Sequence, residues 1–150
     1  MAHSLARLHV HLVFGTKHRA PLIHDGVRDA FHGYVFGTLS KLDCGPVIVN
    51  SVEDHVHILF NLNRSMALSK VVEEIKKSSS KWLKVQGQVL SAFGWQNGYG
   101  AFAVSEANIS AVRRYILKQQ EHHKKKTFEA EYKALLVSNG LPFDDHQLWD

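Results

Sequence analysis

Histidines separated by one residue occur twice in this sequence, each time within an otherwise apolar run. The runs are HVHLVF at residues 9–14 and HVHILF at residues 55–60. Successive side chains of a β-strand point to opposite faces, so His55 and His57 project to the same face, about 7 Å apart. Two imidazoles at that spacing can converge on one metal ion or one phosphate. Two half-exposed histidines that bind nothing are the alternative.

A second group of residues that could take part in catalysis or metal binding lies in RRYILKQQEHH, residues 113–123. Tyr115 and Gln119 are four residues apart, so on one continuous helix they lie one above the other and can reach one point. A tyrosine is a workable nucleophile where a cation lowers the cost of forming phenolate, and the amide oxygen of Gln is a competent metal ligand. The alternative role of Tyr115 is packing at the edge of an apolar stripe.

Charged residues accompany both groups. Glu53 and Asp54 precede the second histidine pair and can orient an imidazole, although acidic residues are also common in hairpin turns. Basic residues flank the tyrosine and cluster elsewhere; they can neutralise phosphates, or they can simply form solvated helix faces. The basic residues expected to contact nucleic acid on this ground are Lys76, Lys77, Lys81, Arg113, Arg114, Lys118 and Lys124–Lys126.

The composition limits the class of protein. The chain has 150 residues, of which 45% are hydrophobic, enough for a single core, so we expect residues 1–150 to form one domain. The formal net charge of +4 favours a polyanionic partner. Cys44 is the only cysteine, and neither a membrane-spanning run nor a signal-peptide pattern is found. We therefore predict a cytoplasmic protein with no membrane partner.

Hydrophobic periodicity predicts the elements that position these residues. Alternating patterns predict strands at residues 7–14 and 101–104, and a hairpin of two strands around SVED at residues 51–54. Apolar residues at spacings of three and four predict helices. The predicted helices cover residues 27–42, 66–83, 108–124 and 128–136.

This order of elements predicts an α+β fold. We expect a ferredoxin-like antiparallel sheet with two helices on one face, followed by C-terminal helices that carry the tyrosine. In that topology the first and third strands are the adjacent central pair. Both histidine pairs then share the face of the sheet that the two crossover helices leave uncovered.

Five blocks of the sequence resemble the insertion-sequence-200-like single-tyrosine transposases, a family of the HUH endonuclease superfamily. In order, the blocks are TKHR, EDHVHILFNL, SKVVEEIKKSSSKWL, WQNGYGAFAVS and YILKQQEHHKKKTFEAEYKALL, and the match extends from about residue 8 to the final LWD. The resemblance implies an enzyme that cuts and rejoins single-stranded DNA through a 5′-phosphotyrosine link. The DNA it implies is the end of a mobile element, which carries a hairpin. It also implies a homodimer in which the tyrosine helix of one subunit completes the histidine site of the other.

The resemblance assigns roles to matching positions. It makes His55 and His57 metal ligands, Gln119 the third ligand and Tyr115 the nucleophile. Imidazole ligands alone would also suit zinc or nickel, but the resemblance implies Mg²⁺ or Mn²⁺ as the cofactor.

The first histidine run matches the family less closely. His11 lies at the position where the family has one histidine, so we expect it beside the site, in contact with DNA or with a ligand histidine. His9 departs from the family pattern and is expected to be incidental. Lys17 and Arg19 lie in the TKHR block and are expected to contact DNA.

Other functions remain open. A nonenzymatic single-stranded nucleic-acid-binding domain would use the basic surface while Tyr115 serves only in packing. A replication initiator or relaxase of the same superfamily would use similar residues, although the motif holds no second tyrosine. A domesticated nuclease that no longer moves its own element is the third alternative.

Overall fold

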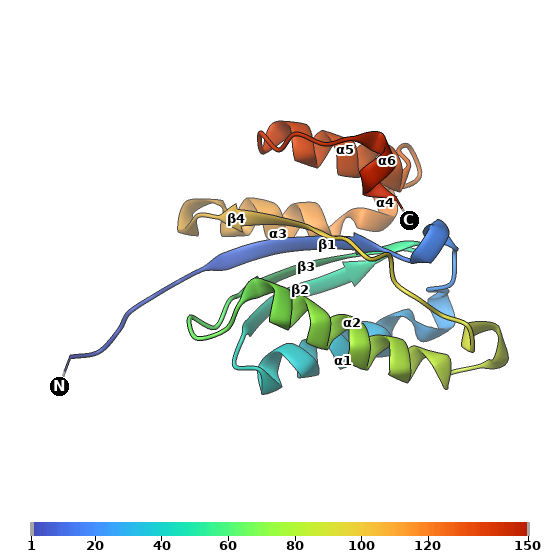
Figure 1. Cartoon of the computed structure of the whole chain (residues 1–150), viewed down its shortest axis with the longest axis horizontal. Helices are drawn as coiled ribbons and strands as arrows, with labels where there is room; N and C mark the ends of the chain where they lie inside the picture. Colours follow the sequence, from blue (N-terminus) through green and yellow to red (C-terminus); the bar gives the residue numbers. More distant parts are fainter. Residues whose placement is uncertain (1, 150) are drawn as a thin grey trace.

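Residues 2–149, which the computed structural model describes, form a four-stranded sheet with helices on both sides (Figure 1). The strands are β1 (His9–Gly15), β2 (Gly45–Ser51), β3 (His55–Asn61) and β4 (Gly100–Val104). The α-helices are α1 (Asp25–Lys41), α2 (Leu68–Lys84), α3 (Ile109–Leu117), α4 (Gln119–His122), α5 (Phe128–Ser138) and α6 (Asp145–Leu148). The short 3-10 helices are η1 (Lys17–Arg19), η2 (Gln88–Leu90) and η3 (Glu106–Asn108). None of the helices in this range combines the length and the apolar character needed to cross a membrane.

The strands follow the order β2-β3-β1-β4, and each neighbouring pair is antiparallel. β1 and β3 are therefore the central pair, with Val13 opposite His57 and Gly15 opposite His55. The predicted α+β, ferredoxin-like sheet is confirmed, and so is the face on which the histidine pairs lie.

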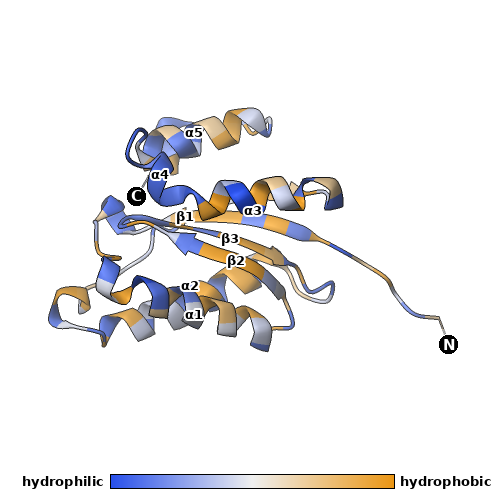
Figure 2. Cartoon of the chain, turned by 180° about the vertical axis from the view of Figure 1, so that it is seen from behind, coloured by the Kyte–Doolittle hydropathy of each residue, from blue (hydrophilic) through white to orange (hydrophobic). Residues whose placement is uncertain are grey.

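The two faces of the sheet bury different sets of side chains. Leu12 and Phe14 of β1 belong to the larger apolar core, which also contains residues of α1 and α2. Val13 points to the other face, where it forms a smaller core with Phe102 and Phe128 beneath α3 and α5. Figure 2 shows apolar residues along the strands between these two helical layers. The histidine-bearing face is thus covered by the C-terminal part of the chain.

One predicted helix differs in its extent. Apolar spacing predicts a continuous helix over residues 108–124, whereas α3 ends at Leu117 and α4 begins at Gln119. Nδ2 of Asn50, on β2, donates to the carbonyl oxygens of Ile116 (2.7 Å) and Leu117 (3.3 Å). The last carbonyls of a helix have no intrahelical partner, so Asn50 satisfies them and stabilises the break.

Replacing Asn50 with Ala is expected to lower the free energy of unfolding by about 1–3 kcal/mol, because buried partners of its amide are left unpaired. Urea titration followed by circular dichroism measures this change. Asn108→Ala is the matched control, since Asn108 is exposed and its side chain caps no helix; it should shift stability by less than about 0.5 kcal/mol. Equal effects of the two substitutions would show that Asn50 does not hold the helix end.

Candidate active site

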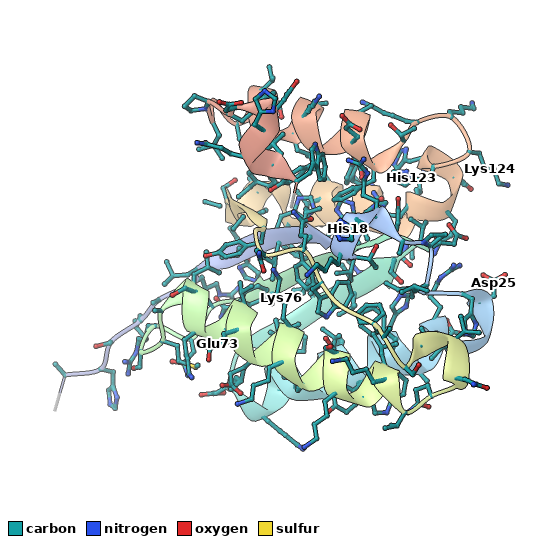
Figure 3. All side chains as sticks on the ribbon, turned by 45° about the vertical axis from the view of Figure 1, so that its right-hand side comes forward. His18, Asp25, Glu73, Lys76, His123 and Lys124 are labelled. Carbon is teal, nitrogen blue, oxygen red and sulfur yellow. The ribbon has the colours of Figure 1, made fainter. Side chains whose placement is uncertain are left out.

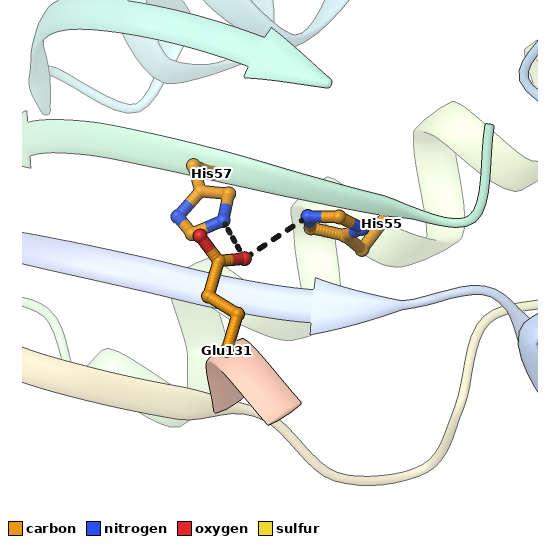
Figure 4. Close-up of side chains that lie close together, drawn as sticks. All are labelled: His55, His57 and Glu131. Atoms are coloured by element: carbon orange, nitrogen blue, oxygen red, sulfur yellow. Dashed lines mark hydrogen bonds and ion pairs between the residues drawn. The ribbon is translucent and has the colours of Figure 1, made fainter. Parts of the chain in front are cut away.

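His55 and His57 lie on β3 and are fully buried, each with 0% exposure. Their spacing on the strand directs both imidazoles toward the layer formed by the C-terminal helices. Both Nε2 atoms approach the same carboxylate oxygen, Oε1 of Glu131, at 3.3 Å for His55 and 3.0 Å for His57 (Figure 4). The two imidazoles therefore converge on one point in the interior.

Glu131 is the centre of this cluster. It lies on α5 and is 3% exposed. Its Oε1 is also 3.0 Å from Nε2 of His123. Its Oε2 accepts hydrogen bonds from the Tyr115 hydroxyl and from Nε2 of Gln119, the latter at 3.1 Å. One carboxylate thus links the strand histidines to the expected nucleophile and the expected third ligand.

Tyr115 is half-buried on α3, with its ring centroid 5.9 Å from that of His57 and 4.9 Å from that of His122. Gln119 is fully buried, and its Oε1 is 3.3 Å from Nε2 of His55. The helix break separates Tyr115 from Gln119, so they do not share one continuous helix face as expected. Both side chains nevertheless reach Glu131 Oε2, because α5 brings the carboxylate between them.

No motif spacing in the sequence identifies Glu131 or His123 as a site residue. For Glu131 a signal exists: it follows Phe128 by three residues and adjoins Tyr132, on the buried side of α5. Glutamate is rarely fully buried unless it is paired, so a Glu within an apolar stripe indicates a buried partner. For His123 nothing in the sequence distinguishes it from the neighbouring His122.

Aromatic packing fixes the position of α5. Phe128 stacks on the imidazole of His55, with ring centroids 4.1 Å apart. The ring fits because Gly15 lies beside it; a Cβ at that position would be 2.6 Å from Phe128 Cε2. Trp149 packs edge-on against Phe128 at 5.7 Å. The helix that carries Glu131 is thereby held on the central strands.

Burial and hydrogen bonds set the charges of Tyr115 and Glu131. Burial, and then the hydrogen bond to Glu131, raise the pKa of Tyr115, so the phenol is protonated at neutral pH. Burial alone would raise the pKa of Glu131, but hydrogen bonds from His123, His55 and His57 outweigh it and lower that pKa. The cluster therefore holds an ionised carboxylate next to a protonated phenol.

Further partners orient the two strand histidines. Nδ1 of His57 is 2.8 Å from Nε2 of His11, and Nδ1 of His55 is 2.8 Å from Oδ1 of Asp54. Burial lowers the pKa of His57 to about 4 and that of His11 to about 3. Burial acts in the same direction on His55, but its hydrogen bonds to Asp54 and Glu131 outweigh burial and raise its pKa. His11, 4% exposed, thus contacts a histidine that is expected to bind metal.

Two residues near the histidine pairs lie outside the cluster. Oε1 of Glu53 is 3.2 Å from Nη2 of Arg28, so this acidic residue does not orient an imidazole as expected. His9 shares the face of His11, but between residues 2 and 149 its side chain forms no hydrogen bond with the cluster.

The metal-free protein is expected to lose stability as the pH falls from 6.5 to about 4. His11 and His57 have lowered pKa values in the folded chain, so the unfolded chain binds more protons in this window. Each of these imidazoles then costs up to about 1.4 kcal/mol per pH unit. Urea titrations at successive pH values, on wild type and on His11→Phe, measure the slope. A slope that His11→Phe leaves unchanged would contradict the expectation.

The donor atoms of the cluster fit a divalent cation. The ligand atoms of His55, His57 and Glu131 all lie within 4.8 Å of one another. Adjacent ligands about 2.1 Å from an octahedral ion are about 3.0 Å apart, close to the 3.0 and 3.3 Å between the imidazole nitrogens and Glu131 Oε1. Oε1 of Gln119 adds a neutral oxygen next to His55. The mixture of nitrogen and oxygen donors is compatible with Mg²⁺ or Mn²⁺ without selecting between them.

A basic pocket of about 660 Å³ opens beside the cluster. Tyr115, Glu131 and His122 line it together with Lys124–Lys126, which are exposed. The Nε2 atom of His122 is buried and has no hydrogen-bond partner within the described part of the chain. The pocket thus connects the tyrosine hydroxyl to a positively charged surface that suits a phosphate backbone.

Some of the basic residues expected to bind DNA lie on the helix that carries Tyr115 or at its end. Arg113, Arg114 and Lys118 are exposed on α3 or at its end, on the segment that carries Tyr115. The structure therefore brings these three cations to the layer that contains the cluster.

Lys17 and Arg19 lie in η1, directly after β1. Arg19 is 3.4 Å from Oε2 of Glu129 and sits 4.7 Å above the ring of Trp149. Its guanidinium therefore already has partners, while Lys17 is exposed.

Lys76, Lys77 and Lys81 lie on α2, and Figure 3 shows Lys76 in the helical layer across the sheet from His123. Nζ of Lys76 donates to the carbonyl oxygens of Gln96 (2.6 Å) and Gly98 (2.8 Å). The structure therefore does not bring these three lysines to the cluster, and Lys76 holds the loop before β4.

Solved structures support the fold assignment. A protein described as a candidate transposase from Deinococcus radiodurans is similar with a TM-score of 0.61 and 20% identity, over 79% of this chain and 95% of that chain. A REP-associated tyrosine transposase, solved bound to a REP hairpin, is similar with a TM-score of 0.58 and 14% identity, over 100% of this chain and 95% of that chain. No curated protein sequence matches this chain.

The sequence itself identifies the family. The model of the family described as "Transposase IS200 like" matches residues 4–119, a segment that contains both strand histidines, Tyr115 and Gln119. The chain therefore belongs to the IS200-like transposases, a family of enzymes.

Proposed function

We propose that this transposase cleaves and rejoins single-stranded DNA in a metal-dependent reaction, with Tyr115 as the nucleophile that forms a 5′-phosphotyrosine link. The observation that carries the proposal is the shared carboxylate: Glu131 contacts the Tyr115 hydroxyl with one oxygen and both strand imidazoles with the other. Residues 1–150 would then act as one nuclease domain.

The cofactor would be Mg²⁺ or Mn²⁺, held by His55, His57 and Glu131 with the Gln119 oxygen beside them. Such an ion supplies positive charge that offsets the charge of the phosphate. The chain itself keeps the ligands in place: His11 and Asp54 orient the two imidazoles through their Nδ1 atoms.

Tyr115 would attack as follows. Its hydroxyl oxygen forms a bond to phosphorus, the bond from phosphorus to the 3′-oxygen breaks, and the 3′-oxygen takes a proton from water to become a free hydroxyl. Oε2 of Glu131 accepts a hydrogen bond from that hydroxyl and so orients the attacking oxygen, while the phenol proton passes to water as the bond to phosphorus forms. Because the phosphotyrosine retains the ester, a 3′-hydroxyl can reverse the step without an outside energy source.

The substrate we propose is single-stranded DNA that carries a hairpin, such as the end of a mobile DNA element. The basic pocket with Lys124–Lys126 and the cations Arg113, Arg114 and Lys118 lie in the same layer as Tyr115, which supports a strand that crosses the tyrosine. The REP hairpin bound to the similar REP-associated transposase is consistent with this choice.

A labelled hairpin oligonucleotide tests the proposal. The enzyme is expected to form a protein–DNA adduct that survives denaturation and that requires a divalent ion. A nonenzymatic binder would shift the oligonucleotide in native gels and form no adduct.

The subunit arrangement is a separate prediction. Tyr115 lies next to the histidines of its own chain, so we propose that each protomer carries a complete site even if the protein forms the homodimer that the resemblance implies. A mixture of Tyr115→Phe and His57→Ala chains is then expected to show no recovery of cleavage. Recovery in the mixture, measured by adduct formation, would instead show that the tyrosine helix crosses between subunits.

A further inference from the structure

Tyr115 borders two hollows of different character. One is the basic pocket. The other is a groove of about 330 Å³ between β4, α3 and α5. We call it the base groove; its walls include Phe102, Val112, Leu135 and the ring of Tyr115, with His11 also lining it. A strand whose phosphate meets the tyrosine hydroxyl therefore passes next to both hollows.

The chemistry of the base groove excludes a phosphate. Within residues 2–149 no Lys, Arg, Asp or Glu side chain lines it. His11 is 4% exposed, and its Nε2 lies 2.8 Å from Nδ1 of His57. Of the two hollows that Tyr115 borders, the basic pocket with Lys124–Lys126 is therefore the one that offers cations to phosphates.

The same walls suit a nucleobase. Apolar and aromatic side chains pack against the flat faces of bases regardless of sequence. The amides of Asn108 and Asn139 also line the groove and can hydrogen-bond to the edge of a base. The volume lies at the lower end of the roughly 300–1,000 Å³ typical of small-molecule pockets, which fits one base and not a duplex.

We propose that the base groove receives one unpaired nucleobase next to the scissile phosphate and thereby sets a sequence preference at that position. The inference rests on the proposed function, because it takes Tyr115 as the point of cleavage. A base in the groove would lie beside His11, which is 2.8 Å from His57. Seating of the correct base would therefore also support the orientation of an imidazole at the cluster.

The test uses the full-length protein, Mg²⁺ or Mn²⁺, and a pool of hairpin oligonucleotides with a randomised single-stranded flank. Covalent adducts are isolated and their DNA is sequenced, which identifies the cleaved position directly. Wild type is expected to show a base preference at a position directly adjacent to the cut. Removing the base at that position, with an abasic nucleotide, is expected to slow adduct formation roughly 10- to 100-fold.

A matched pair of variants locates the preference in the groove. Ala111 is exposed and lines the base groove, whereas Ala134 is exposed on α5 and does not. Ala111→Trp fills the groove, so it should lose the base preference and react equally with the intact and the abasic strand. Ala134→Trp should behave as wild type. Ala111→Leu, a smaller change, should weaken the preference in the same direction.

The outcomes separate this inference from the proposed function. The inference would be overturned if an abasic nucleotide on either side of the cut changed the rate of adduct formation by less than about twofold. The proposed function would then remain intact. A base preference that Ala111→Trp and Ala111→Leu both retain would overturn the inference as well. If wild type forms no adduct with any member of the pool, the proposed function itself fails.

Discussion

Tyr115→Phe is expected to abolish the covalent protein–DNA adduct and to reduce cleavage roughly 1,000-fold or more, because it removes the oxygen that we propose attacks the phosphate. The phenyl ring keeps the contacts with His57 and His122, so the variant should remain folded. A denaturing gel of a labelled hairpin oligonucleotide, with Mg²⁺ or Mn²⁺ present, measures the adduct directly.

Tyr132→Phe is the matched control for this loss. Tyr132 is a buried tyrosine on the same helix as Glu131, and it lies in the smaller core. Its variant should form the adduct at the wild-type rate. Adduct formation by Tyr115→Phe at that rate would show that another group attacks the phosphate.

His57→Ala is expected to weaken binding of Mn²⁺ by more than the roughly 10- to 100-fold that is typical when a residue supporting a metal ligand is lost. The substitution removes one proposed ligand and leaves Glu131 Oε1 without one of its imidazole partners. Calorimetric titration of Mn²⁺ into the metal-free variant measures the loss, and circular dichroism shows whether the variant is folded.

His9→Ala tests which histidine pair binds the ion. His9 and His57 each belong to a His-x-His pattern in the sequence, but the cluster around Glu131 contains His57 and not His9. The His9 variant should bind Mn²⁺ as wild type does. If it lost binding as completely as His57→Ala, the order that we assign to the two pairs would be wrong.

The strands and their faces could be predicted because they depend on local periodicity. Alternation along β3 places His55 and His57 on one face whatever the rest of the chain does. The order of helices and strands then leaves few topologies, and the antiparallel arrangement with β1 beside β3 follows from short connections. The sequence alone was therefore sufficient for the sheet and for the convergence of two imidazoles.

The centre of the cluster could not be predicted in the same way. Glu131 reaches the imidazoles from α5, a helix that packs on the sheet partly through Phe128 against Gly15 and His55. Such packing between distant segments leaves no fixed spacing in the sequence. The helix break before Gln119 depends on Asn50, which lies 66 residues before Ile116. Helical periodicity continues through the break, so a pattern of apolar residues predicts one helix.

Because the buried carboxylate of Glu131 lies on α5, the position of this helix limits how far the chain can be shortened. The segment shared with the family ends at residue 119, but Glu131 and the aromatic side chain of Phe128 come from the next helix. A protein trimmed to the shared segment would leave two imidazoles facing water, with no anion to balance a bound ion and an open apolar surface on the sheet. Any shortened version of this protein that keeps the cluster must therefore extend through α5.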